Sequence, residues 1–252
     1  MENFKNCCGE SVTMMNENML HGSAYYLREF ILHKLEEMNI KAETMLDLGC
    51  GFCDLTHNIA NVIKAKYVFG VDVNPECINA CLAKGIKAFR LNLESDYLPF
   101  RSGTIDFISM IELIEHIRNT DHVLREAWRV LKPKGLLVLT MPNLGSWRNR
   151  LLLLFGFHPE YAEVSNEIQV SGIRSRPSTE PKPAGHIRLY TLKALTMHLQ
   201  YIGFKIVGIY GVSSGFEHSK FHPVIRSMLG VIDQILSLKA SLAQHIVIFA
   251  SK

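Results

Sequence analysis

Segments of strand character alternate with segments of helical character along most of the 252-residue chain. Short apolar runs are typical of strands, whereas apolar residues three or four positions apart are typical of amphipathic helices. The strand-like segments are 44–48, 67–73, 86–91, 104–110, 135–141, 204–210 and 245–250, and the helical ones are 23–38, 54–64, 75–84, 120–131, 191–201 and 224–238. This order predicts an α/β fold with a doubly wound, mostly parallel seven-stranded sheet covered by helices on both faces.

The alternation breaks between residues 144 and 188. This stretch holds an apolar run at 151–157, followed by a region rich in Pro, Ser and Gly at 171–185. We interpret 144–188 as an insertion that forms a lid on the substrate side, before the last strands. The length is compatible with a single domain over 1–252, in which residues 1–40 form an N-terminal helical segment.

The charge balance and the apolar runs limit the class of protein. The chain has 27 Lys and Arg against 24 Asp and Glu, a formal charge of +3, which lacks the basic excess of an extended nucleic-acid surface. The longest apolar run, 151–157, is far shorter than the roughly 18 residues that suggest a membrane span. The first ten residues contain no apolar signal core. We therefore expect a cytoplasmic protein that does not bind nucleic acid extensively.

The cysteines are expected to be reduced thiols in such a protein, without a disulfide framework. The spacing of two pairs, C-x-x-C and C-x-x-x-C, superficially resembles a zinc set. The first pair, Cys50 and Cys53, however, falls inside a glycine turn at residues 49–53. We therefore interpret Cys50, Cys53, Cys77 and Cys81 as small packing residues. The six cysteines are Cys7, Cys8, Cys50, Cys53, Cys77 and Cys81.

Two glycines, Gly49 and Gly51, stand where the first strand turns into a helix, and bare backbone there lets a ligand approach closely. A dinucleotide fingerprint would need another glycine at Asp54, whose charge would face a pyrophosphate poorly. An acidic turn instead suits S-adenosylmethionine, which carries a sulfonium and an ammonium. Asp47 could pair with that ammonium, and Asp72, at the end of the next strand, could accept both ribose hydroxyls.

Three motifs, LDLGCG at 46–51, ELIEH at 112–116 and LKPKG at 131–135, together with Asp72, resemble the class I S-adenosylmethionine-dependent methyltransferases. The chain is most similar to the branch that contains the ubiquinone-biosynthesis O-methyltransferases, over about residues 23–143. This resemblance implies a Rossmann-like methyltransferase fold. It implies a cofactor site at Arg28, Asp47, Gly49, Gly51, Asp72, Val73, Asn92, Leu93 and Ile111.

Within that set, the resemblance places the methionine part of the cofactor at Gly49 and Gly51, the ribose at Asp72, and the adenine beside Asn92 and Leu93. The chain departs from the family at two positions. Cys53 stands where the family has a third glycine, and its Cβ disfavours a positive φ. Asn92 stands where an acid is common, although an amide can both donate to and accept from an adenine edge.

Glu112, Glu115 and His116 follow the fourth predicted strand, at the edge where open α/β sheets bind ligands. If this segment is helical, positions i, i+3 and i+4 project to one side and could hold Mg²⁺, Mn²⁺ or Zn²⁺. The same pattern resembles a metal site in ubiquinone-pathway O-methyltransferases. It also occurs in small-RNA ribose 2′-O-methyltransferases, which add a downstream histidine, here His186. Alternatively, the glutamates only orient loops and His116 is a packed histidine.

We expect transfer of the sulfonium methyl group to a small-molecule nucleophile, with oxygen favoured, by in-line displacement. His116 or His186 could act as the general base. His158, Arg188 and Tyr190 are further acceptor-side candidates. The segment 147–157 could meet a lipid-like acceptor or a membrane surface, or could simply be packed lid. Two alternatives stay open: a metal-assisted RNA ribose 2′-O-methyltransferase and a non-catalytic module that binds S-adenosylmethionine.

Overall fold

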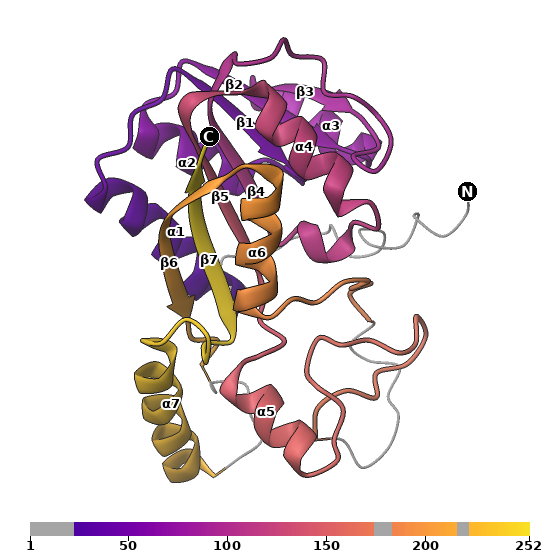
Figure 1. The fold of residues 1–252 in the computed structure, drawn as a ribbon, viewed down its shortest axis with the longest axis vertical. Helices are drawn as coiled ribbons and strands as arrows, with labels where there is room; N and C mark the ends of the chain where they lie inside the picture. The colour runs from indigo at the N-terminus through magenta and orange to yellow at the C-terminus, as the bar shows by residue number, and fades with distance from the viewer. Residues whose placement is uncertain (1–22, 174–182, 216–221) are drawn as a thin grey trace.

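The computed structural model of the chain describes residues 23–173, 183–215 and 222–252 (Figure 1). Residues 1–22 of the expected N-terminal segment, including Cys7 and Cys8, lie outside the described residues, as do residues 174–182 of the expected lid. Among the described residues, no helix is both long and apolar enough to cross a membrane.

The elements follow the predicted alternation with small changes in their bounds. The strands are β1 (Thr44–Leu48), β2 (Tyr67–Asp72), β3 (Lys87–Arg90), β4 (Ile105–Ile111), β5 (Leu131–Pro142), β6 (Lys205–Val212) and β7 (His245–Ser251). The helices are α1 (Ser23–Glu37), α2 (Asp54–Ile63), α3 (Pro75–Ala83), η2 (Ile114–His116), α4 (Thr120–Val130), α5 (Trp147–Leu154), α6 (Leu192–Ile202) and α7 (Pro223–Ser237). β5 starts four residues earlier than predicted because Leu131 already pairs with Ile105.

All seven strands form one sheet in the order β3-β2-β1-β4-β5-β7-β6. The pairs on the β3 side of β5 are parallel, whereas β7 runs antiparallel to both of its neighbours, β5 and β6. The prediction of a doubly wound, mostly parallel seven-stranded sheet is confirmed. The order reverses between β1 and β4, and open α/β sheets bind ligands at the carboxyl edge of such a reversal.

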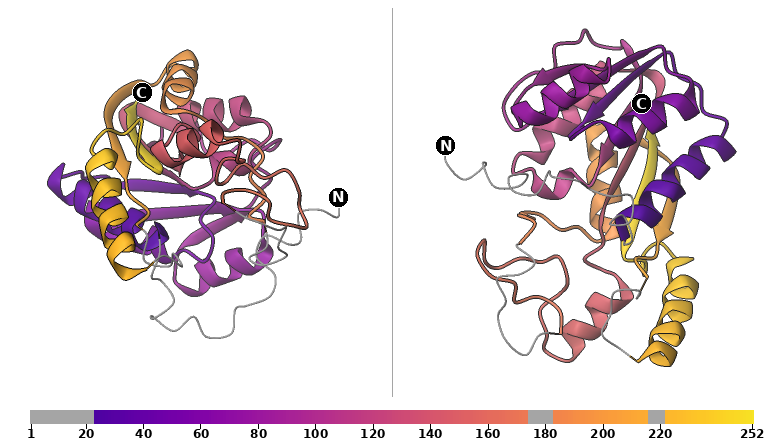
Figure 2. Two further views of the ribbon diagram at one scale, coloured as in Figure 1. Left: turned by 90° about the horizontal axis from the view of Figure 1, so that it is seen from below. Right: turned by 180° about the vertical axis from the view of Figure 1, so that it is seen from behind.

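Two apolar layers cover the sheet (Figure 2). On one face, α1 and α2 bury Leu27, Ile31 and Ile59 against the sheet. On the other face, α4 and α6 bury Leu124 and Leu199. Because helices cover both faces, β1, β4 and β5 are almost continuously buried, as expected for central strands of a parallel sheet.

The cysteines correct one expectation. Cys53 and Cys81 form a disulfide, so the prediction of reduced thiols is wrong for this pair. Cys50 and Cys77 are buried and take no part in this disulfide. The pairing arises because α3 packs behind the turn after β1, which brings residues 28 positions apart to a Cα–Cα distance of 5.4 Å. Sequence spacing carries no information on that tertiary contact.

Candidate active site

The turn after β1 exposes backbone at the carboxyl edge of the sheet. Gly49 and Gly51 have φ values of 74° and 50°, a region that favours glycine. A Cβ at Gly49 would lie 2.8 Å from a Leu113 methyl carbon, whereas a Cβ at Gly51 would have no atom within 4 Å among the described residues. The positive φ therefore favours glycine at position 49, where a Cβ would also displace the Leu113 side chain, and Gly51 presents its backbone to open space that a ligand can enter.

Asp72 links that turn to the end of β2. Its Oδ2 accepts a hydrogen bond from the Gly51 N–H at 3.0 Å, and its Oδ1 accepts one from the Asn74 N–H at 2.9 Å. Because a carboxylate oxygen has more than one acceptor position, each oxygen can still accept a hydroxyl proton. The half-buried Asp72 therefore fixes the turn and keeps capacity for a diol such as ribose.

Asp47 lies beneath the turn and is 5% exposed. Its carboxylate accepts hydrogen bonds from the Thr56 hydroxyl and, at 2.7 Å, from the Ser109 hydroxyl. Burial raises the pKa of Asp47 to about 6, although both hydroxyls oppose this rise. The structure thus gives Asp47 two hydroxyl partners that sequence spacing could not reveal, and its contact with a cofactor ammonium stays a prediction.

Cys53 occupies the position of the missing third glycine. It caps α2 with a φ of 63°, so it adopts the left-handed conformation that its Cβ disfavours. The disulfide to Cys81 holds this residue in place. The departure from the family pattern therefore leaves the backbone path of the turn intact.

The other predicted cofactor residues surround this turn. Val73 and Asn92 are exposed, Leu93 is buried, and Ile111 ends β4. Arg28 is half-exposed on α1, which packs against α2. Apart from Arg28, the predicted cofactor set lies at the carboxyl ends of the four adjacent strands β3, β2, β1 and β4.

Glu112 follows β4 with a φ of 49°, an uncommon backbone conformation that often marks a functional site. Its Oε1 accepts a hydrogen bond from the Thr140 hydroxyl at 3.0 Å, and its Oε2 lies 3.3 Å from His245 Nδ1. Burial favours the protonated form, but His245 and Thr140 outweigh it, and the pKa of Glu112 falls below its usual range.

This geometry does not bring Glu112 together with Glu115 and His116 as helical spacing predicts. The single 3₁₀ turn η2 begins only at Ile114, and the positive φ at Glu112 breaks the helical path before it. Glu112 consequently lies against β5 and β7. The group of possible metal ligands at this edge consists instead of Glu115, His116 and His186, whose ligand atoms lie within 4.8 Å of one another.

Glu115 is completely buried, and neither of its carboxylate oxygens has a hydrogen-bond partner among the residues that the structure describes. Burial, followed by the negative charge of Glu112, raises the pKa of Glu115 to about 9. A buried carboxyl group without a partner is costly to the fold. Such a group is therefore a candidate ligand for a cation or for an acceptor molecule.

The two imidazoles beside Glu115 are oriented by backbone carbonyls. His116 Nδ1 lies 3.2 Å from the Gly185 oxygen, and His186 Nδ1 lies 3.1 Å from the Tyr161 oxygen. Because a carbonyl only accepts, Nδ1 carries the proton and Nε2 of each neutral ring keeps its lone pair. Burial and then the charge of His186 lower the pKa of His116, which favours that neutral form. This is the arrangement of a metal-binding or proton-accepting histidine.

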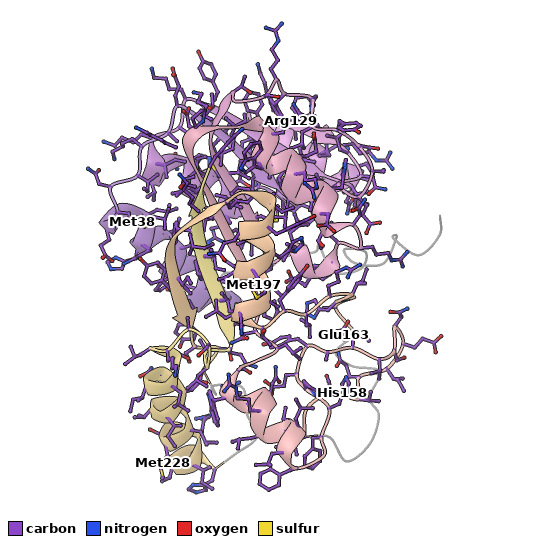
Figure 3. All side chains as sticks on the ribbon, viewed as in Figure 1. Met38, Arg129, His158, Glu163, Met197 and Met228 are labelled. Carbon is purple, nitrogen blue, oxygen red and sulfur yellow. A yellow bond between two sulfur atoms is a disulfide. The ribbon has the colours of Figure 1, made fainter. Side chains whose placement is uncertain are left out.

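Glu163 positions His186 and was missed by sequence reasoning. Its carboxylate accepts hydrogen bonds from the backbone N–H groups of Ala184 and Gly185 at 2.6 Å and of His186 at 3.0 Å. Figure 3 shows Glu163 on the long loop that follows α5. A single acid in an irregular segment gives no sequence signal for this role, and neither does His245, which first meets Glu112 through the fold.

The side chains of the further lid candidates make other contacts, although the Arg188 backbone N–H donates to the Glu115 carbonyl at 3.0 Å. His158 is exposed, Arg188 donates to the Arg118 carbonyl at 2.9 Å, and the Tyr190 hydroxyl donates to Thr120 at 3.2 Å. None of the three belongs to the group formed by Glu115, His116 and His186 in the described part of the chain.

A family model described as a methyltransferase domain matches residues 19–209, which is most of the chain. The chain belongs to this family. The family implies S-adenosylmethionine as the methyl donor.

Two curated methyltransferases show how far the similarity reaches. The mitochondrial ubiquinone biosynthesis O-methyltransferase of Saccharomyces cerevisiae is 30% identical over 139 residues, which are 48% of this chain and 45% of that protein. Norajmaline N-methyltransferase of Rauvolfia serpentina is 32% identical over 109 residues, 39% of this chain and 36% of that protein. The chain spans about half the length of the first of these relatives and less of the second.

An S-adenosylmethionine-dependent methyltransferase structure from Archaeoglobus fulgidus has a TM-score of 0.57 at 17% identity and covers 89% of this chain and 94% of that one. At this identity the likeness shows the fold. Together, the family and its relatives identify a class I S-adenosylmethionine-dependent methyltransferase near the ubiquinone O-methyltransferase branch. They give no support to the RNA ribose alternative.

Proposed function

We propose that this methyltransferase transfers the methyl group to an oxygen atom of a small-molecule acceptor by in-line displacement. The observation that carries the proposal is the group formed by Glu115, His116 and His186 beside the cofactor turn. A hydroxyl group must lose its proton to become a good nucleophile, whereas an amine already carries a lone pair. A group that can bind a cation or accept a proton therefore favours an oxygen acceptor.

The residues of the turn fit the donor that the family implies. S-adenosylmethionine supplies the electrophilic methyl group when it is bound. Gly51 offers open backbone, Asp72 retains acceptor capacity for ribose hydroxyls, and Asp47 places a carboxyl group under the turn. These two carboxyl groups suit a cationic ligand. The donor carries no phosphate, so the site needs no phosphate-binding residue.

Glu115, His116 and His186 would hold a divalent ion, which would lower the pKa of a bound hydroxyl group. One carboxylate and two imidazoles suit Zn²⁺ better than Mg²⁺, because Mg²⁺ prefers oxygen ligands. The unpartnered carboxylate oxygens of Glu115 support this proposal. In the metal-free alternative, Nε2 of His116 or His186 accepts the hydroxyl proton directly, and Glu115 stays protonated.

Binding of the donor is tested first. Calorimetry with S-adenosylmethionine and S-adenosylhomocysteine on the wild type should show binding, and Asp72→Ala should weaken it by about 100-fold, since two hydrogen bonds to a charged group are lost. Glu76→Ala, an exposed acid four residues away, is the matched control and should bind as the wild type does. Absence of binding to the wild type would contradict the assignment of this site.

The acceptor and the metal are tested together with phenolic and amine acceptors of similar size, by following S-adenosylhomocysteine release. We expect turnover of phenols only, with a loss of at least about 10-fold in His186→Ala and none in His57→Ala, an exposed histidine on α2. Turnover that chelation abolishes and Zn²⁺ restores supports the metal, whereas turnover that survives chelation supports the histidine base. Methylation of amines alone would overturn the oxygen proposal.

We further propose that residues 144–188 form the lid over the acceptor and that the acceptor is lipid-like. α5 and α7 lie side by side below the sheet in both views (Figures 1 and 2). The Asp233 carboxylate on α7 accepts a hydrogen bond from Trp147 Nε1 on α5 at 2.7 Å. Both helices expose large apolar side chains, namely Leu151, Leu153 and Leu154, with Phe155 and Phe157 just after α5, and Val224, Ile225, Met228, Val231, Ile232 and Ile235.

Co-sedimentation with anionic and neutral vesicles tests whether this apolar pair of helices meets a membrane surface. Leu154→Asp combined with Phe155→Asp should abolish sedimentation, and Tyr97→Asp, an exposed aromatic position outside the two helices, should leave it unchanged. Equal sedimentation of both variants would leave these helices as a solvent-exposed lid only.

The cytoplasmic location of the protein stays a prediction.

A further inference from the structure

A second group of possible metal ligands lies behind the glycine turn. The sulfur atoms of Cys50, Cys53 and Cys81 lie within 4.8 Å of one another, and all three residues are buried. Cys50 lies in the turn after β1, Cys53 caps α2, and Cys81 lies in α3. The group packs against Ile86 and the partly buried Val68 in an apolar cluster separate from Glu115.

A fourth thiol is close to this group. Cys77 is 1% exposed and precedes Cys81 by one turn of α3, so both project from the same face of that helix. The four residues therefore form a C-x-x-C pair and a C-x-x-x-C pair, and both spacings fall in the range of structural zinc sites. Sequence spacing alone did not justify a zinc site, but the fold brings the sulfur atoms of Cys50, Cys53 and Cys81 to one place.

The distance between the sulfur atoms of Cys50 and Cys81 fits a metal site. In tetrahedral thiolate coordination, Zn–S bonds of about 2.3 Å put neighbouring sulfurs about 3.8 Å apart. The Cys50 and Cys81 sulfurs are 3.7 Å apart. The strand below leaves room for them at Gly70, where a Cβ would come within 2.7 Å of the Cys50 sulfur. Only the bonded pair would have to separate.

We propose that, when the Cys53–Cys81 disulfide is reduced, Cys50, Cys53 and Cys81 bind a Zn²⁺ ion. The ion fastens the cofactor turn to α3, as the disulfide does in the oxidised chain. The disulfide and the metal site are thus alternative states of the same sulfur atoms. This site is separate from the group at Glu115, because the two groups share no residue and the ligands here are all sulfur atoms.

The chemistry is balanced with a phosphine as reductant. The phosphine gives two electrons to the S–S bond and becomes a phosphine oxide by taking oxygen from one water molecule, whose two protons pass to the two thiols. Zn²⁺ binding then displaces the protons of the coordinating thiols to solvent. Oxidation of Cys53 and Cys81 by a disulfide oxidant removes two of the ligands and releases the ion.

The experiment uses the whole chain, reduced with a phosphine without oxygen, and Co²⁺ as a spectroscopic probe for Zn²⁺. We expect thiolate-to-cobalt charge-transfer absorption that saturates at one ion per chain and disappears when Zn²⁺ is added. Cys50→Ser and Cys81→Ser should each remove it. The double variant Cys7→Ser/Cys8→Ser and the variant His186→Ala should keep it, since neither change touches these ligands.

A second measurement on the unaltered chain does not depend on folding of the variants. Alkylation followed by peptide mass spectrometry should show Cys50, Cys53 and Cys81 protected when the reduced chain holds Zn²⁺ and modified after chelation. Three results would overturn the proposal: no charge-transfer absorption in the reduced chain, absorption that persists in Cys50→Ser and Cys81→Ser, or a disulfide that the phosphine cannot reduce in the folded chain.

Discussion

Two buried glutamates, Glu126 on α4 and Glu115 in η2, have opposite surroundings. The Glu126 carboxylate accepts hydrogen bonds from Arg129 Nε at 2.7 Å, from a terminal guanidinium nitrogen of Arg129 at 2.8 Å, and from the Leu98 N–H at 2.9 Å. Glu115 has no such partner among the described residues. Burial acts on both carboxyl groups, but the guanidinium outweighs it and lowers the pKa of Glu126, whereas the pKa of Glu115 rises to about 9.

The difference separates a group that stabilises the fold from one that is available to a ligand. Arg129 also donates to the carbonyls of Leu98 and Phe100, so this ion pair fastens the loop before β4 to α4 (Figure 3). A fully hydrogen-bonded buried pair rigidifies the structure, while an unpartnered buried carboxyl group lowers stability and needs another explanation. At Glu115 the explanation that we propose is a ligand of the methyltransferase site.

The largest expected effect comes from breaking the satisfied pair. Arg129→Ala leaves the Glu126 carboxylate buried with one remaining donor, and we expect a loss of about 3 kcal/mol in the free energy of unfolding. Urea denaturation monitored by circular dichroism measures this change. Arg125→Ala, which removes an exposed arginine from the same helix, should cost less than about 1 kcal/mol. Equal losses in the two variants would show that the ion pair of Arg129 with Glu126 contributes no more to the free energy of unfolding than the exposed Arg125 does.

Asp47 is an intermediate case, because hydroxyl groups but, among the described residues, no cation contact its buried carboxylate. Its pKa of about 6 in the folded chain exceeds the value of 3.8 that applies to an exposed carboxyl group. Between about pH 4 and pH 6, the folded chain keeps a proton that the unfolded chain has lost, so stability falls as pH rises through this window. The decrease approaches about 3 kcal/mol and is complete above about pH 6.

Asp47→Asn should remove this pH dependence. The measurement is the difference in unfolding free energy between variant and wild type at several pH values, which should grow in favour of the variant from about pH 4 to pH 6 and then stay level. A constant difference across the range would mean that Asp47 is ionised normally. Ser109→Ala offers a matched comparison, since it keeps the carboxyl group and removes one hydroxyl donor.

The smallest effect on stability is expected at the unsatisfied site. Glu115→Gln replaces a carboxyl group that is already neutral at pH 7, so the free energy of unfolding should change by less than about 1 kcal/mol. The same change should weaken Zn²⁺ binding at this group by at least about 10-fold, which calorimetry measures. Glu126→Gln should show the reverse, with reduced stability and unchanged Zn²⁺ affinity. Reduced stability of both variants by the same amount would remove the contrast.

The sequence predicts the fold almost completely because periodicity and turn residues are local signals. The strand before Gly49 and the helix that Pro75 begins both form where expected. It also predicts which residues reach the carboxyl edge, since strand ends determine that edge. The ion pair of Glu126 with Arg129 has helical spacing, but its contact with the loop before β4 depends on tertiary packing.

The sequence was less informative where backbone conformation or a long-range contact decides the outcome. Helical spacing groups Glu112 with Glu115, whereas the structure leaves Glu112 outside the group of mutually close ligand atoms, and nothing local indicates the positive φ at Glu112. His186, a candidate from the sequence, lies beside Glu115 and His116, but the segment that delivers it is held by Glu163, which no motif marks. The Cys53–Cys81 disulfide likewise results from the packing of α3 behind the turn.

Ala184, Gly185 and His186 donate hydrogen bonds to Glu163. These contacts link the position of this loop, which an acceptor must pass, to the position of the His186 imidazole. His116 is bound to the same loop, through the Gly185 carbonyl. A movement of this loop that admits an acceptor would therefore displace one imidazole and release the orienting contact of the other. While the loop is displaced, a hydroxyl acceptor would lack the proposed proton acceptors, and it would regain them when the loop returns.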